Sequence, residues 1–173
     1  MYHCATMPMT THIGNGMYGA VVIDPPDLAH VDQDFVLIQS ELYLGTQGGT
    51  GDTAAMAAGT PDAVVFNGES NQYDTHPLTA RPGQRVRIWV LDAGLSLSSS
   101  FHVVGTQFDT VFSEGAYLLR PGNAEDGAAQ VLALQPAQGG FVEFTIPAAG
   151  HYAIVSHRMV HAARGAHGLL LAR

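Results

Sequence analysis

Residues 85–90 read RVRIWV and residues 141–146 read FVEFTI, and both stretches alternate in side-chain character. Alternation is typical of a β-strand, in which successive side chains point to opposite faces of a sheet. Further short runs rich in Val, Ile, Phe, Tyr and Leu lie on either side of them, at residues 20–23, 35–44, 63–66, 99–104, 110–113, 130–134, 152–156 and 168–172. The sequence therefore predicts an all-β fold.

Turn signals separate these runs, among them DPPD from residue 24, RPG from residue 81 and PAAG from residue 147. Strands at this density predict a β-sandwich, which takes about 100 residues. We expect residues 62–173 to form one complete sandwich. Residues 46–61 are small and polar, and we expect a mobile loop or linker there. Residues 1–45 hold too few strands for a second sandwich, so we interpret them as the end of a preceding domain.

The composition narrows the classes of function. The chain has 173 residues, of which 46% are hydrophobic, and this is enough to bury an apolar core. Its formal net charge is −8, with seven Arg and no Lys, which argues against nucleic acid as a partner. No apolar run approaches the roughly 20 residues that span a bilayer, so no membrane span is predicted. The first residues also lack the charged and apolar regions of a signal peptide.

The first nineteen residues, MYHCATMPMTTHIGNGMYG, contain the one cysteine of the chain beside a histidine. Neighbouring side chains of a strand face opposite ways, so His3 and Cys4 would serve different sites. Cys4, His12 and Met17 can fold back over one metal ion. A thiolate, an imidazole and a thioether suit copper in electron transfer, although such a site also needs a second histidine. Zinc is less favoured without a CxxC motif, and a free thiol or an intermolecular disulfide stays open for Cys4.

Residues 2–25, YHCATMPMTTHIGNGMYGAVVIDP, resemble the end of the first cupredoxin domain of copper-containing nitrite reductases, in the branch with a short loop between cysteine and histidine. Further segments follow in the order of that family: DFVLIQSELYLG, DAVVFNG, SSSFHVVGTQFDTVFSEG, GGFVEFTIPAAGHYAIVSH and GAHGLLL. The resemblance covers nearly the whole chain apart from the linker. It implies a cupredoxin-like Greek-key β-sandwich, with a partial second cupredoxin at the N-terminus.

The resemblance also implies roles for individual residues. His3 becomes a ligand of the catalytic type 2 copper, and His157 becomes the type 2 ligand that is lent to a neighbouring subunit, which implies a homotrimer. His102 is implied as the catalytic histidine that passes protons to the substrate through a water molecule. The ligands of the electron-accepting type 1 copper would be Cys4, His12 and Met17.

The implied reaction is the reduction of nitrite to nitric oxide, with copper as the cofactor and a small protein as the electron donor. One electron and two protons are consumed, so a group that titrates near neutrality must lie close to the substrate. The family is periplasmic or extracellular. The sequence lacks most of the first cupredoxin domain, with the remaining ligands, so we expect a truncated or cleaved enzyme, or a separate chain or segment that carries the missing part.

Two alternative functions stay open. A two-domain multicopper oxidase of the laccase kind would need His-x-His pairs, and this sequence contains none. A non-catalytic cupredoxin module could store copper, carry electrons or support oligomerisation. Of the remaining histidines, His161 and His167 are close in sequence to His157 and could support its site or lie on the surface. Solvated surface positions are expected for His30, His76 and His151.

Overall fold

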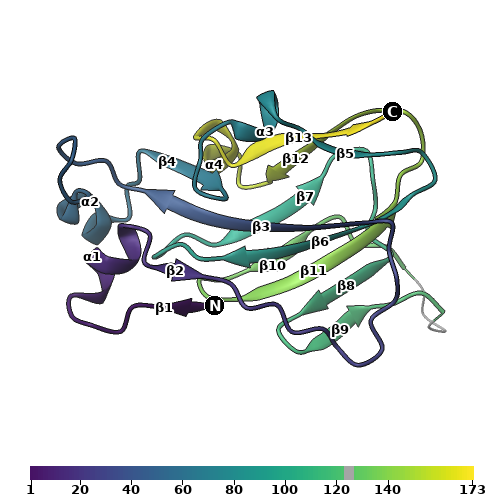
Figure 1. The fold of residues 1–173 in the computed structure, drawn as a ribbon, viewed down its shortest axis with the longest axis horizontal. Coiled ribbons are helices and arrows are strands. Elements are labelled where there is room, and N and C mark those ends of the chain that lie inside the picture. Colours follow the sequence, from purple (N-terminus) through teal and green to yellow (C-terminus); the bar gives the residue numbers. More distant parts are fainter. Residues whose placement is uncertain (123–126) are drawn as a thin grey trace.

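A computed structural model describes residues 1–122 and 127–173, which form a β-sandwich with a small N-terminal hairpin beside it (Figure 1). The larger sheet has the order β4 (Ala63–Phe66), β3 (Gln33–Leu42), β6 (Arg85–Asp92), β11 (Gly139–Thr145), β8 (Thr110–Ser113) and β9 (Ala116–Leu119). The smaller sheet has the order β10 (Leu132–Leu134), β7 (Ser99–Val103), β12 (Gly150–Ser156), β13 (His167–Ala172) and β5 (Leu78–Ala80). The prediction of an all-β sandwich is confirmed.

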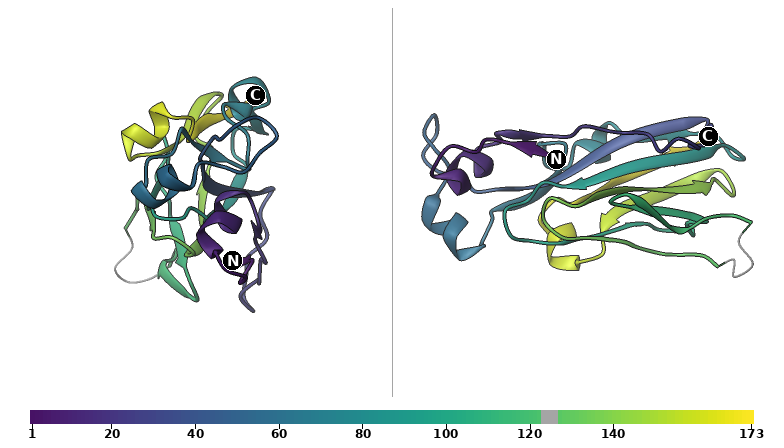
Figure 2. Two further views of the ribbon diagram at one scale, coloured as in Figure 1. Left: turned by 90° about the vertical axis from the view of Figure 1, so that its left-hand side faces the viewer. Right: turned by 90° about the horizontal axis from the view of Figure 1, so that it is seen from below.

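The hairpin consists of β1 (Tyr2–His3) and β2 (Tyr18–Gly19), with helix α1 (Met9–Gly14) between them. Three more short helices connect strands: α2 (Thr53–Ala58), α3 (Gln72–Thr75) and α4 (Met159–Ala163). Figure 2 shows the two sheets of the sandwich stacked as layers, with the hairpin against the outer side of the larger sheet. Throughout the described ranges, every helix is too short to cross a bilayer.

The alternation in residues 85–90 and 141–146 fixes the two faces of the larger sheet. β6 and β11 are antiparallel neighbours, with Ile88 opposite Val142 on one face and Trp89 opposite Phe141 on the other. The first face contributes to the core between the sheets, where apolar side chains from both layers are fully buried: Phe66, Phe101, Phe108, Phe144, Ile154 and Leu170. Burial of this apolar surface is the main force that holds the layers together.

Two features near the N-terminus depart from the sequence prediction. β3 pairs with β6 in parallel and with β4, so residues 33–42 belong to the larger sheet, although the sequence analysis grouped them with the partial domain. Residues 20–23, predicted as a strand, form none, because this stretch has no ladder of backbone hydrogen bonds to a neighbour. Val21 and Ile23 are instead 64% and 79% exposed on the outer side of the larger sheet.

The segment between β3 and β4 contains α2, so the expectation of a mobile loop is wrong for residues 53–58. The Asp52 side chain caps the start of α2 by accepting hydrogen bonds from the N–H groups of Ala54 and Ala55, at 2.8 and 3.0 Å. Gly59 ends the helix in the left-handed conformation, with φ of 66°, as is common at helix C-termini. The wider division into residues 1–45, 46–61 and 62–173 stays a prediction.

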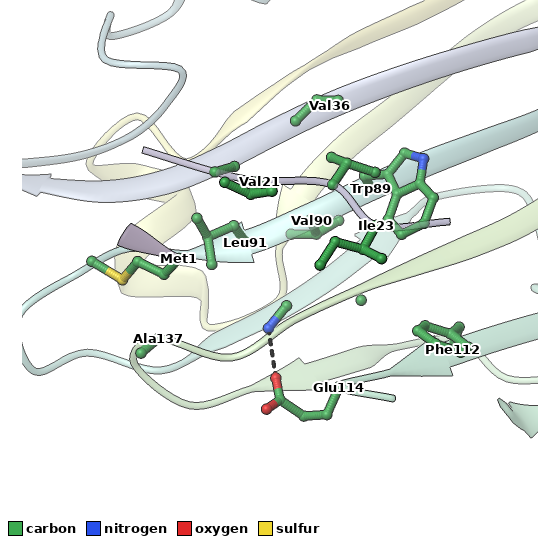
Figure 3. Close-up of a pocket in the computed structure, with 14 residues that line it drawn as sticks. Met1, Val21, Ile23, Val36, Trp89, Val90, Leu91, Phe112, Glu114 and Ala137 are labelled. Atoms are coloured by element: carbon green, nitrogen blue, oxygen red, sulfur yellow. Dashed lines mark hydrogen bonds between the residues drawn. The ribbon is translucent and has the colours of Figure 1, made fainter. Parts of the chain in front are cut away.

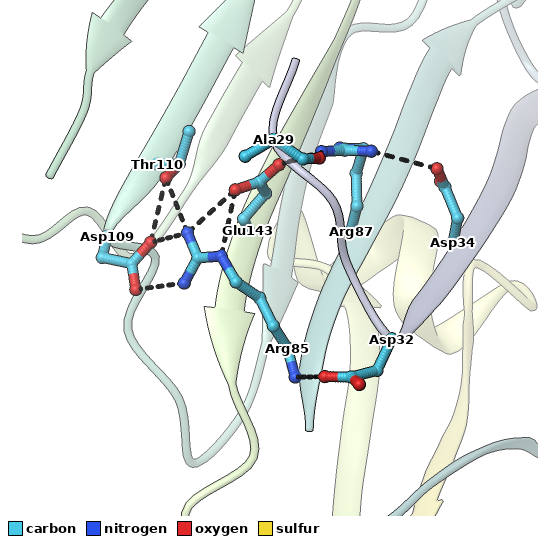
Figure 4. Close-up of polar contacts among 8 residues, drawn as sticks. All are labelled: Ala29, Asp32, Asp34, Arg85, Arg87, Asp109, Thr110 and Glu143. Carbon is cyan, nitrogen blue, oxygen red and sulfur yellow. Dashed lines mark hydrogen bonds and ion pairs between the residues drawn. The ribbon is translucent and has the colours of Figure 1, made fainter. Parts of the chain in front are cut away.

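A polar network joins the outer face of the larger sheet to the connector after the hairpin (Figure 4). Glu143 on β11 lies between two guanidinium groups, 2.8 Å from Arg85 Nη2 and 2.8 Å from Arg87 Nε. Arg87 is 3% exposed and also donates to the carbonyl oxygen of Ala29 in the connector. Because Glu143 and Arg87 are both buried, each depends on the other for charge compensation.

We predict that Glu143→Gln lowers the free energy of unfolding by about 3 kcal/mol, because it leaves buried Arg87 without its main counter-charge. Urea unfolding of the purified chain measures this loss. Asp34→Asn is the control: Asp34 also pairs with Arg87, at 3.1 Å, but its side chain is 47% exposed. The control should cost less than about 1 kcal/mol. Equal losses in both variants would contradict the role given to burial.

Candidate metal centre

The N-terminal hairpin brings Cys4 and Met17 together. β1 and β2 pair antiparallel, with His3 opposite Tyr18. The ladder continues by one hydrogen bond, in which the N–H of Cys4 donates to the carbonyl oxygen of Met17 at 3.0 Å. Residues thirteen positions apart in the sequence therefore face each other at the loop end of the hairpin, where α1 connects one strand to the other.

The end of α1 joins His12 to Met17 through the backbone. The N–H of Met17 donates to the carbonyl oxygen of His12 at 3.1 Å, and the N–H of Gly16 donates to that of Ile13 at 2.9 Å. This pair of bonds is a Schellman motif, which requires a left-handed residue just past the helix. Gly16 fills that position, with φ of 91°, which a residue with a Cβ adopts only under strain. The GNG sequence thus sets the spacing between the histidine and the methionine.

Cys4 and His12 face each other across this loop. The Sγ atom of Cys4 lies 3.2 Å from Nδ1 of His12, and the N–H of Thr6 points at Sγ from 3.5 Å. The side chain of Cys4 is half-buried, whereas Met17 is 52% exposed. A sulfur and a ring nitrogen at this separation can contact one ion together, so the two donors fit a copper site of the thiolate and imidazole type.

By strand alternation, His3 is expected to point away from that loop. Its Nδ1 lies 2.8 Å from the carbonyl oxygen of Cys4, which can only accept a hydrogen bond. Nδ1 must therefore carry the proton, and Nε2 is left with the lone pair that a metal ion needs. The side chain is exposed, so Nε2 is available to an ion at the surface.

A second pair of histidines lies on the smaller sheet. His102 on β7 is 8% exposed, and its Nδ1 donates to the carbonyl oxygen of Gln130 at 2.5 Å. The ring centroid of His102 is 5.5 Å from that of His157, which directly follows β12 and is exposed. The backbone N–H of His157 donates to the carbonyl oxygen of Ser100 at 2.7 Å. The sandwich thus holds a buried histidine beside an exposed one.

These two groups of predicted site residues do not meet within one chain. β1 lies apart from α4, whose start follows His157, in each of the views in Figures 1 and 2. Within residues 1–122 and 127–173, no hydrogen bond, ion pair or ring contact joins His3 to His102 or His157. The same ranges hold no cluster of three or more His, Cys, Asp and Glu side chains that could bind a metal ion. Each group is therefore at most part of a metal site.

Two buried carboxyl groups lie at the end of the sandwich from which α4 projects. Asp92 is 0% exposed, and one of its oxygens, Oδ2, has no hydrogen-bond partner. Burial raises the pKa of Asp92 to about 7, and nearby Glu41 raises it further, while a hydrogen bond from the N–H of Gly94 opposes the shift. Glu41 accepts hydrogen bonds from the N–H groups of Ser96 and Leu97.

His161 on α4 is a third buried titratable group in this region. It is 5% exposed, and its Nδ1 has no hydrogen-bond partner. Burial lowers the pKa of His161 and the charge of Arg158 lowers it further, although Glu41 acts in the opposite direction. His167 differs, because its Nε2 lies 2.9 Å from Oδ2 of Asp74, a carboxylate oxygen that accepts the hydrogen bond. The sequence left open whether His161 and His167 lie on the surface. The structure buries His161 and leaves His167 half-exposed.

The fold agrees with comparisons to known proteins. The family model described as multicopper oxidase matches residues 33–170. The chain belongs to the multicopper oxidase family. Within this family it is similar to the copper-containing nitrite reductase of Neisseria gonorrhoeae, with 37% identity over 170 residues. The alignment covers 94% of this chain but 42% of the Neisseria protein, so the chain spans less than half the length of the curated relatives it matches.

Solved structures of family members show the same arrangement. The copper nitrite reductase from Nitrosomonas europaea superposes with a TM-score of 0.84 at 34% identity, over 99% of this chain and 60% of that one. The reductase from Thermus scotoductus SA-01 superposes with a TM-score of 0.80 at 29% identity, over 95% of this chain and 38% of that one. The cupredoxin-like fold class is therefore confirmed, and membership of a copper-containing family supports copper as the metal.

Sequence reasoning missed the buried acid pair and the roles of Asn15 and Gly16. The Asn-Gly pair after His12 was a usable signal for the end of a helix. Asp92 gave a weaker signal of a buried acid, because it follows the apolar run IWVL, and a carboxyl group is unusual in such a run. The proximity of Glu41 and Asp92, however, depends on residues that are far apart in the sequence.

Asp92 should make stability depend on pH. Its pKa is about 7 in the folded chain against an ordinary 3.8, so the folded state holds the proton more tightly and the free energy of unfolding falls as the pH rises from 3.8 to 7. Asp92→Asn removes this titration. We predict that the stability of the variant relative to the unmodified chain rises by about 2–4 kcal/mol between about pH 4 and pH 8. Urea unfolding at both pH values measures the difference, and a difference independent of pH would contradict it.

Proposed function

We propose that this chain is part of a copper-containing nitrite reductase that converts nitrite to nitric oxide. The observation that carries the proposal is the contact of Cys4 Sγ with His12 Nδ1 at 3.2 Å, with the exposed His3 directly beside Cys4 in the sequence. One peptide then links a thiolate site to an imidazole site. The similarity to reductases from Neisseria and Nitrosomonas supports the same reaction.

The thiolate site would receive the electron. Cys4 and His12 would hold a type 1 copper, with Met17 as the weak axial ligand, and a second histidine would come from outside residues 1–173. The Schellman motif supports this assignment, because it fixes the backbone of His12 relative to Met17. A small electron-donor protein would supply the electron at this end of the molecule.

The imidazole site would bind the substrate at a subunit interface. His3 of one subunit and His157 of the next would hold a type 2 copper in a homotrimer. The separation of β1, which carries His3, from α4, which begins soon after His157, supports sharing between subunits (Figure 1). Bound copper would supply single electrons and polarise the nitrite anion.

His102 would supply protons beside this site. Nitrite reduction takes up one electron and two protons and releases one water with the nitric oxide, so a titrating group must stand within hydrogen-bond reach of the departing oxygen. Nδ1 of His102 is committed to the carbonyl oxygen of Gln130, which leaves Nε2 to receive and give the proton. Its burial beside the exposed His157 would keep this atom close to substrate and shielded from bulk water.

The rest of the first cupredoxin domain would cover the apolar groove between the hairpin connector and the larger sheet, either as part of the same polypeptide or as a separate chain. The groove has a volume of about 270 Å³, and Figure 3 shows Val21, Ile23 and Val36 around it with Trp89 at its floor. Exposed apolar patches of this kind are typical of interfaces. By analogy with its relatives, we propose the periplasm as the location.

The multicopper oxidase function, with dioxygen as the substrate, is the weaker candidate, because the His-x-His pairs of a three-copper cluster are missing from the sequence. A comparison of substrates separates the two. We expect copper-loaded enzyme, completed with the first domain, to form nitric oxide from nitrite and to consume dioxygen much more slowly. Dioxygen consumption without nitrite turnover would contradict the proposal, and the absence of both activities would favour a non-catalytic cupredoxin module.

Within the same enzyme, His102→Ala should lower nitrite turnover by about 10²–10⁴-fold, which is the usual contribution of general acid catalysis. The blue thiolate absorption should persist, because His102 is not a ligand of the type 1 site. His151→Ala is the matched control, since His151 is exposed on β12 and has no proposed role. Equal turnover in the two variants would remove His102 from the reaction.

A further inference from the structure

We propose that α2 is a brace that holds the copper-ligand loop, defined as residues 4–17, and that Met56 and Asn15 are its positioning residues. Figure 1 shows α1 and α2 side by side at one end of the molecule. α2 belongs to the segment between β3 and β4, so the brace ties the loop to the sandwich. The inference rests on the proposed function only for the identity of the metal that the loop binds. The contacts between α1 and α2 are independent of that function.

Met56 packs against the end of α1. It is 2% exposed, although α2 is otherwise largely exposed. A Cβ on Gly14, the last residue of α1, would lie 2.7 Å from Cε and 2.8 Å from Sδ of Met56, and 3.2 Å from Leu95. A larger residue at position 14 would therefore force the end of the Met56 side chain to move. A Cβ on Gly51 would also lie 2.7 Å from Cε of Met56, so the methionine fills the space between two glycine backbones.

Asn15 provides a polar contact beside this apolar one. Its Oδ1 accepts a hydrogen bond from the N–H of Gly51 at 2.9 Å, and its Nδ2 donates to the carbonyl oxygen of Thr11 at 2.7 Å. One amide group thereby links the last turn of α1 to the residue that directly precedes the cap of α2. Asn15 and Met56 act on the same junction through different forces, so they can be tested separately.

The brace is itself anchored to the sandwich. The N–H of Asp52 donates to the carbonyl oxygen of Tyr43 at 3.2 Å, and the Asp52 side chain caps α2. Tyr43 is 3% exposed, and its hydroxyl donates to buried Glu41. A continuous set of contacts thus runs from the core strand β3 to the end of α1.

The consequence for the ligands follows from the Schellman motif. Gly14 and Asn15 directly follow the helical turn that carries His12, and the same turn fixes the N–H of Met17. If α1 loses its contact with α2, the helical turn that carries His12 can shift relative to Cys4 on the other side of the loop. A rigid brace would therefore keep the ligand geometry constant while the oxidation state of the copper changes, and small ligand movements favour fast electron transfer.

The first measurement uses the metal-free chain of 173 residues. Amide hydrogen exchange at Gly16 and Met17 reports the opening of the loop. Met56→Ala and Asn15→Ala should each accelerate this exchange by about tenfold or more, because each removes one contact of the closed loop. Met56→Leu should restore slow exchange, since it keeps the apolar volume. Unchanged exchange in both alanine variants would overturn the brace.

The control is Ile146→Ala, which removes a buried side chain from the main core, a cluster that does not include Met56. If it accelerates loop exchange as much as Met56→Ala, global destabilisation explains the effect and the brace is wrong. The second measurement is the thiolate-to-copper absorption of the copper-loaded enzyme. Its wavelength should shift in Met56→Ala and Asn15→Ala and stay unchanged in Met56→Leu and Ile146→Ala. Faster exchange without a shift would overturn the positioning role, and absence of the band in the unmodified enzyme would instead count against the proposed function.

Discussion

Successive side chains of a β-strand point to opposite faces of the sheet, and the sandwich and the metal centre both depend on this alternation. On β6 and β11 it sends Ile88 and Val142 into the core and turns Trp89 and Phe141 to the outer face. Directly after β1, Cys4 contacts His12, and alternation is expected to place the neighbouring His3 on the other side. Two neighbouring residues can therefore belong to two metal sites that share one peptide bond.

The outer face of the larger sheet connects these two parts of the molecule. It is not a plain solvated surface, because Arg87 and Glu143 are buried there and Arg87 reaches the backbone of Ala29. The connector from the hairpin is thus held on the sandwich by charged groups that have little access to water. At the other end of β3, Met56 and Asn15 hold α1. The hairpin is attached to the sandwich at two places, which suits the proposed role of its loop in holding metal ligands in a fixed geometry.

The sequence allowed the strands with strong alternation to be predicted well, and β4 and β8 have the predicted limits. Residues 20–23 failed because an apolar run forms a strand only when a partner strand lies beside it. α2 was missed because TAAMAA has little hydrophobic periodicity, although Asp52 and Gly59 are recognisable caps. The opposition of Cys4 and His12 follows from local spacing and was predictable. The burial of Asp92 and His161 results from long-range packing, which spacing does not reveal.

The most direct test is the copper content and visible spectrum of copper-loaded protein, completed with the first domain, compared between the unmodified sequence and Cys4→Ser. If Cys4 and His12 bind a type 1 copper, the unmodified protein has an intense blue or green thiolate band. Cys4→Ser should lose this band together with one copper per chain, while copper at the histidine site is retained. The same spectrum and the same copper content in both proteins would contradict the assignment of Cys4 as a ligand, and with it the proposed electron path to His3.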